Sequence, residues 1–106
     1  MKSIHWLESS LEDIKKFSES VRAELGFDLY LLQQGDKPRD AKFLKTVGAW
    51  EIRVKDSSGA YRVAYVLMSK ETITVVHCFK KKTQRTSKKD LDLIRKRLKE
   101  EKGTKK

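Results

Sequence analysis

The chain has 106 residues, which suits one domain with a modest hydrophobic core and leaves no room for a second catalytic lobe. Lys and Arg number 25 against 15 Asp and Glu, for a formal net charge of +10. Residues 80–106 carry 13 of these bases and 4 of these acids, a net of +9, and so uneven a distribution favours a polyanionic partner, with nucleic acid first.

The sequence lacks the segments that mark export, membrane insertion or metal binding. No apolar run is long enough for a signal peptide or a transmembrane helix, and the single Cys78 cannot form an internal disulfide. There is no zinc-ligand spacing and no glycine-rich phosphate loop. We therefore expect a cytoplasmic protein with no metal, no cofactor and no membrane partner.

The N-terminal third predicts a strand and two helices. Residues 2–7 fit a short first strand. Ser9 and Glu12 match a capping box, so a helix should begin there, and Gly26 suits the left-handed position just after its end. Residues 28–34 then predict a shorter second helix, antiparallel to the first, which makes a helical hairpin.

The middle of the chain predicts three antiparallel strands. Gly and Pro place a loop at residues 35–40. Apolar residues then recur at every second position, so residues 50–55 predict a strand with one apolar and one charged face. Residues 56–59 have turn chemistry, residues 61–68 predict the second strand of a hairpin, and the β-branched residues 72–79 predict a buried third strand.

The C-terminal segment predicts a last helix and completes the fold class. Ser87 can cap that helix with Asp90 as its reciprocal partner, and the helix should run to about Lys99. The order βααβββα predicts an α+β fold over residues 1–106, with the helical hairpin packed on one face of a small antiparallel sheet. The opposite face should stay at least partly open.

Cations gather at the end of the third strand. Lys80, Lys81 and Lys82 would place three ammonium groups at one rim of the sheet, where an anion can be held, although solvated lysines that block edge aggregation are the alternative. Arg62 lies in an otherwise apolar strand, so it is either paired with Glu51 across the hairpin or used for function. In a surface ion pair, its loss would cost at most about 1 kcal/mol.

Other candidate residues have equally ordinary alternatives. Arg53 fits a routine exposed strand face, and His77 is more typical of a hydrogen-bonded structural histidine than of a catalytic one. Trp50 is more typical of a core residue than of a platform on which single-stranded nucleic acid stacks, although stacking stays open.

Three segments together resemble a known family. WEIRV, YRVAYV and VVHCFKKKTQRTSKKDLDLIRKRL are similar to the RelE/HigB toxin superfamily, most of all to its phage-derived, HigB-type branch, and the similarity extends over essentially the whole chain. The resemblance implies a type II toxin that enters the ribosomal decoding site and cleaves messenger RNA without a metal. It also implies a HigA-like helix-turn-helix antitoxin as partner, beside the ribosome and mRNA.

The resemblance also assigns roles to residues. Attack of a ribose 2′-OH on the neighbouring phosphate needs a base, cations that hold the developing charge, and an acid. Arg62 matches the strand arginine that stabilises the phosphate, Lys80 and Lys81 match a basic wall, and Glu51 and His77 lie where some branches place a base and an acid. The expected RNA-binding residues are Arg53, Lys82, Arg85, Lys88 and Lys89.

Two other functions stay open. A ParE-like, gyrase-inhibiting toxin has the same fold without RNA cleavage. A basic nucleic-acid-binding module would use the cationic C-terminal segment without any chemistry.

Overall fold

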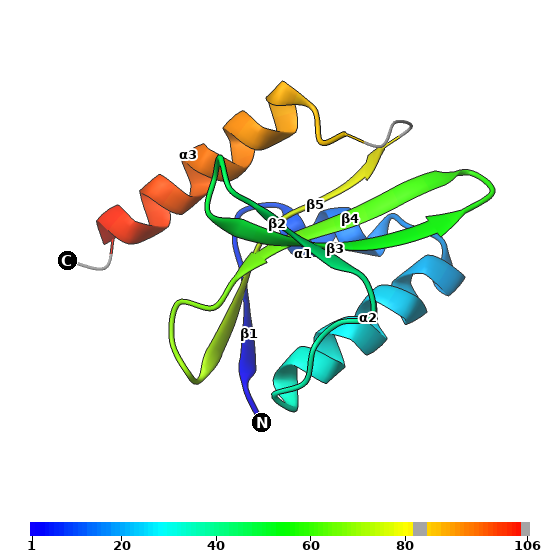
Figure 1. Cartoon of the computed structure of the whole chain (residues 1–106), viewed down its shortest axis with the longest axis horizontal. Coiled ribbons are helices and arrows are strands. Elements are labelled where there is room, and N and C mark those ends of the chain that lie inside the picture. The colour runs from blue at the N-terminus through cyan, green and yellow to red at the C-terminus, as the bar shows by residue number, and fades with distance from the viewer. Residues whose placement is uncertain (82–84, 105–106) are drawn as a thin grey trace.

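The computed structural model of the protein describes residues 1–81 and 85–104. Figure 1 shows the arrangement of its helices and strands. In chain order these are β1 (Ser3–Trp6), α1 (Ser10–Lys15), α2 (Glu19–Gln33), β2 (Ala41–Leu44), β3 (Ala49–Asp56), β4 (Gly59–Val66), β5 (Thr72–Lys81) and α3 (Lys88–Thr104). The predicted α+β class, with a C-terminal helix, is confirmed.

The five strands form one sheet in the order β1-β5-β4-β3-β2. Strands β2 to β5 are antiparallel neighbours, as predicted for the last three, whereas β1 pairs parallel to β5 with Ile4 opposite Ile73. Two details of the prediction are therefore wrong, because the sheet is mixed and it contains β2, an extra strand. Ala41–Leu44 has only four residues, too few for a period of two to stand out in the sequence.

The break between the first two helices lies earlier than predicted. Helix α2 runs straight through Gly26. The break between the helices lies before the start of α2, where the Ser18 hydroxyl accepts a hydrogen bond from the Val21 N–H at 3.4 Å. The buried side chains of Leu25 and Leu29 lie on either side of Gly26, so packing overrides the glycine's weak helix propensity. The predicted capping box is also absent, because the Ser9 hydroxyl donates to Asp13 Oδ2 at 2.8 Å.

Helices cover the two faces of the sheet from opposite sides (Figure 1). The residues buried together on the α1 and α2 side include Ile14, Val21, Leu25, Leu29, Ile52, Val63 and Val75. A second buried cluster lies under α3 and contains Leu7, Ala49, Ala64, Val76, Phe79, Ile94 and Leu98. The face predicted to be partly open is thus covered by α3, except for a pocket on its β2 side.

Helix α3 is tied to the sheet at its start and along its length. The predicted Ser87–Asp90 cap is confirmed, since the Asp90 N–H donates to Ser87 Oγ at 3.2 Å and that hydroxyl donates to Asp90 Oδ2 at 2.7 Å. A register shift between β4 and β5 leaves Val76 without a partner residue in β4. Arg97 Nη1 of α3 donates to the Val76 carbonyl at 2.9 Å. The helix continues to Thr104, beyond the predicted end near Lys99.

The loop between α2 and β2 is held by an ion pair. The Asp28 carboxylate, buried on α2, accepts from Arg39 Nε at 2.9 Å, from Arg39 Nη2 at 3.2 Å and from the Arg39 N–H at 3.1 Å. The following residue, Asp40, accepts from Arg53 Nη2 at 3.3 Å, which links the loop to β3. Because β2 begins at Ala41, this loop sets where the edge strand starts.

We predict that Arg39→Ala lowers the free energy of unfolding by about 2 kcal/mol, because it leaves the buried Asp28 carboxylate without its main donors. The change should appear as a lower urea midpoint in circular dichroism. The control is Arg22→Ala on the exposed side of α2, which should change stability by at most about 0.5 kcal/mol. Equal midpoints for the two variants would contradict the anchoring role.

Candidate active site

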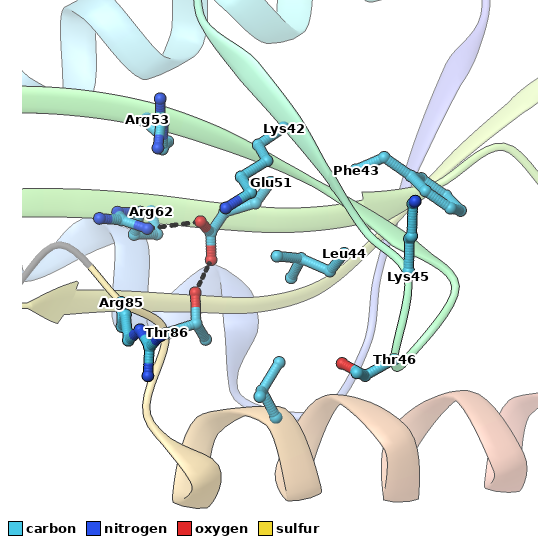
Figure 2. Close-up of a pocket in the computed structure, with 11 residues that line it drawn as sticks. Lys42, Phe43, Leu44, Lys45, Thr46, Glu51, Arg53, Arg62, Arg85 and Thr86 are labelled. Atoms are coloured by element: carbon cyan, nitrogen blue, oxygen red, sulfur yellow. Dashed lines mark hydrogen bonds and ion pairs between the residues drawn. The ribbon is translucent and has the colours of Figure 1, made fainter.

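A pocket of about 600 Å³ opens between β2, the β3–β4 hairpin and the segment that leads into α3 (Figure 2). Five of its described lining residues are Lys or Arg and one is Glu, so its charge suits an anion. The lining residues are Lys42, Phe43, Leu44, Lys45, Thr46, Glu51, Arg53, Arg62, Arg85, Thr86 and Leu91.

The floor of the pocket is a buried ion pair. Arg62 lies opposite Arg53 in the β3–β4 register and Glu51 lies opposite Ala64, so Arg62 and Glu51 are diagonal neighbours on one face. Arg62 Nη1 donates to Glu51 Oε1 at 2.5 Å, and the two side chains are only 2% and 1% exposed. The predicted pairing is confirmed, but the pair is buried, so the cost expected for a surface pair does not apply.

A third residue completes the coordination of the carboxylate. The Thr86 hydroxyl donates to Glu51 Oε2 at 2.6 Å, so each oxygen of Glu51 accepts a hydrogen bond from a different segment (Figure 2). Thr86 belongs to the short segment of residues 85–87, here called the strap, which leads into α3. The strap therefore helps to fix the orientation of the Glu51 side chain by holding one carboxylate oxygen while Arg62 holds the other.

Strand β2 and the turn after it form a wall that the sequence did not predict. Lys42 lies opposite Glu51 in the β2–β3 register, and Figure 2 shows its side chain extending from β2 toward Glu51. Lys45 and Thr46 follow in the turn, where Arg95 Nη2 of α3 donates to the Thr46 carbonyl at 3.4 Å. Lys42 and Lys45 flank the apolar pair Phe43 and Leu44, but this run of four residues is too short to indicate a strand.

The lysines after the third strand do not share one rim. Strand β5 continues to Lys81, and successive residues of a strand point to opposite faces. Lys81 is buried on the α3 side, where its Nζ donates to the Arg85 carbonyl at 2.6 Å and lies 3.8 Å from Asp90. Lys80 lies on the other side, with its Nζ 5.5 Å from the centre of the Tyr61 ring. The prediction that the lysines place their ammonium groups together at one rim was therefore wrong for Lys80 and Lys81. Lys82 lies outside the described residues.

The remaining predicted residues are divided between the pocket and its surroundings. Arg53 and Arg85 line the pocket, whereas Lys88 and Lys89 are exposed in the first turn of α3 and are not among its described lining. Trp50 is 41% exposed, so its prediction as a core residue was wrong. Cys78 is buried as expected, and burial raises the pKa of its thiol to about 12, which makes it a poor nucleophile.

His77 is part of the support of the site. Its Nε2–H donates to Asp90 Oδ1 at 2.8 Å, its ring stacks on Phe79 with the centres 4.5 Å apart, and it is not among the described pocket lining. Burial lowers the pKa of His77, although the bond to Asp90 opposes that shift. The geometry favours the structural interpretation, in which His77 holds the N-terminal turn of α3.

Two other kinds of functional feature are absent from the described parts of the chain. Within residues 1–81 and 85–104, no three His, Cys, Asp or Glu side chains come together as a possible metal site. Among these same residues, no helix is long and apolar enough to span a membrane.

Solved structures identify the class of fold. The chain is similar to the isolated RelE toxin of E. coli, with a TM-score of 0.58 and 18% identity, over 91% of this chain and 98% of that one. It is also similar to a chain of the intact E. coli RelBE toxin–antitoxin complex, with a TM-score of 0.50 and 19% identity, over 80% of this chain and 100% of that one. The protein therefore has a RelE-like fold.

The family follows from the sequence. A family model described as "Phage derived protein Gp49-like (DUF891)" matches residues 12–99. The chain belongs to this Gp49-like family, and the RelE-like fold that the resemblance implied is confirmed. No curated protein sequence matches the chain.

We predict that Arg62→Ala lowers the free energy of unfolding by about 3 to 5 kcal/mol, because it leaves the buried Glu51 carboxylate without its cation. The double variant Glu51→Leu/Arg62→Met should recover most of that loss, since it removes both buried charges and keeps much of the packing volume. Urea unfolding of both variants measures the difference. An Arg62→Ala protein as stable as the wild type would contradict the buried pair.

A pH dependence follows from His77. Because its pKa in the folded protein lies below the ordinary value of 6.5, the unfolded chain takes up the proton first as the pH falls. The stability associated with neutral His77 is therefore complete above about pH 6.5 and is lost as the pH falls below it.

We expect His77→Gln, which can still bond to Asp90, to reduce the loss of stability between pH 7.5 and 5.5. Thermal melts across this range measure it. A slope unchanged by His77→Gln would remove His77 from the acid response.

Proposed function

We propose that this protein is the toxin of a type II toxin–antitoxin system, a ribosome-dependent endoribonuclease that cleaves messenger RNA without a metal. The observation that carries the proposal is the Glu51–Arg62 pair at the floor of a pocket lined by further cations. The RelE-like fold and membership of the Gp49-like family support it. The whole chain, residues 1–106, would act as one cytoplasmic toxin domain.

The pocket contains groups suited to transfer of a phosphodiester to the adjacent 2′-oxygen. In our proposal Glu51 accepts the proton of the ribose 2′-OH as the 2′-oxygen bonds to phosphorus, and the bond from phosphorus to the 5′-oxygen breaks. Arg62 donates to the non-bridging phosphate oxygens, where charge builds up in the transition state. Lys42, on the β2 wall, is placed to give a proton to the leaving 5′-oxygen.

The other cations would hold the RNA rather than take part in bond changes. Arg53 and Arg85 flank Arg62 along the pocket, and Lys45 extends the cationic lining onto the β2 wall. Phosphates bound along this line would place one scissile linkage at Glu51 and Arg62. The excess charge of the C-terminal segment would add attraction to the ribosome and its RNA.

An antitoxin is the second proposed partner. One structural relative is a chain of a toxin–antitoxin complex, and we propose that this protein likewise needs an antitoxin, of the HigA-like helix-turn-helix type. An unrestrained nuclease of translated messages would stop growth, so strong expression of the folded protein without its antitoxin should be toxic.

The test maps the 5′ ends of transcripts after brief induction. We expect new ends inside translated frames, and purified protein with intact ribosomes should still cleave in excess EDTA. Ends that do not depend on translation, or arrested gyrase in place of cleavage, would overturn the proposal. Activity restored by one divalent ion after EDTA would overturn the metal-independent mechanism.

Two conservative variants assign the chemistry to the pocket. Glu51→Gln keeps the size of the side chain but not its basicity, and Arg62→Lys keeps the charge but not the planar pair of donors. Each should lower the cleavage rate by about 10²- to 10³-fold, on the scale of losing one preorganised group. Lys80→Ala, on the opposite side of the sheet, should cleave like the wild type, and a large loss there would favour the lysine-rim prediction instead.

A further inference from the structure

Two aromatic side chains lie exposed at the β2 edge of the sheet. Phe43 of β2 and Trp50 of β3 are directly opposite in the antiparallel register, and their ring centres are 5.1 Å apart at an interplanar angle of 58°. They are 43% and 41% exposed, respectively. Each ring thus offers apolar surface to solvent at a place where the sheet has no further strand among the described residues.

This aromatic pair adjoins the cationic pocket. Phe43 is itself a lining residue of the pocket, and it lies between Lys42 and Lys45, which also line it. Trp50 lines a second hollow, of about 530 Å³, together with Tyr65, and this hollow contains no residue of the first pocket among its described lining. The pair therefore lies where the cationic pocket ends and a more apolar hollow begins.

We propose that Phe43 and Trp50 form a stacking site for a base of single-stranded RNA whose backbone lies in the cationic pocket. This inference rests on the proposed function, because it names a subsite for the same RNA. Aromatic rings accept any unpaired base on their faces, while neighbouring cations hold the phosphates of the same strand. The sequence of β2 supplies both, since Lys42 and Phe43 are neighbours in it.

The charges beside the pair favour RNA over a protein segment as the occupant. The cationic pocket that Phe43 lines contains five Lys and Arg among its described residues against Glu51 alone, and Glu51 already accepts hydrogen bonds at both oxygens. An apolar peptide on the rings would bring no anion to this excess of cations, whereas a nucleotide carries an anion next to every base.

A second exposed aromatic pair serves as the matched control. Phe27 and Tyr30 on α2 are 47% and 48% exposed, and their ring centres are 6.4 Å apart. Neither residue lines the cationic pocket among its described residues. If exposed rings alone bound RNA, the two pairs would behave alike.

The experiment titrates the full-length protein, without ribosomes, with a short single-stranded RNA bearing 2′-O-methyl groups, which cannot be cleaved through the 2′-oxygen. Binding is followed by the fluorescence of Trp50. Trp6 is replaced by Phe, so that Trp50 is the one tryptophan that remains. We expect quenching by the RNA and none by an abasic strand of equal length. Quenching by the abasic strand to the same extent would overturn the stacking site.

Variants titrated into the same RNA carrying a fluorescent label, with its anisotropy as the signal, then measure the contribution of the pair to binding. Phe43→Ala and Trp50→Ala should each weaken RNA binding by roughly 5- to 100-fold, the range for loss of one aromatic–base stack. Phe43→Tyr and Trp50→Phe should retain most of the affinity, and Phe27→Ala/Tyr30→Ala should bind like the wild type. Circular dichroism confirms that each protein is folded.

The outcomes separate the stacking site from the proposed function. Binding unchanged by Phe43→Ala and Trp50→Ala would overturn the inference, and so would loss of antitoxin binding with RNA binding intact, which would make the patch a protein interface. Base-dependent quenching by a protein that cleaves no transcripts would keep the stacking site and reject the nuclease.

Discussion

The buried Glu51–Arg62 pair is the interaction on which the rest of the structure depends. Removing two charges from water costs several kcal/mol for each ion, and only close pairing with full hydrogen bonding offsets that cost. The hairpin brings the two side chains together, but the second carboxylate oxygen needs a donor from elsewhere, which Thr86 supplies. The pair therefore requires the strap, and through the strap it requires α3 to be docked on the sheet.

Asp90, in the first turn of α3, links the strap to the helix and to β5. Its carboxylate accepts from the Ser87 hydroxyl and from His77, and it lies within ion-pair distance of Lys81, which also holds the Arg85 carbonyl. His77 and Lys81 thus act on the pocket from outside, by fixing the position of the strap. His77 and Lys81, to which the resemblance assigned catalytic roles, thus support the strap that orients Glu51 in this geometry.

The sequence indicated what local pattern determines and missed what depends on distant contacts. The β3–β4 hairpin, β5 and the Ser87 cap follow from periodicity and turn chemistry, and each was predicted within a few residues. Glu51 was read as solvent-facing because it alternates with apolar residues, and nothing local reveals that Thr86 covers it. Strand β2 exists because β3 pairs with it, and α2 passes Gly26 because Leu25 and Leu29 are buried, so neither could be read from the local sequence.

Edge strand β2 contributes side chains both to the cationic pocket and to the Phe43–Trp50 pair. Successive side chains of a strand point to opposite faces, so a strand of four residues can place Lys42 on the pocket side and the Phe43 ring toward Trp50. A nucleic acid that used both surfaces would need its phosphate and its base on different sides of this edge. In a duplex the bases are stacked and paired inside, whereas in a single strand a base can turn away from the backbone. If the protein acts on RNA as proposed, this geometry would favour an unpaired strand over a duplex.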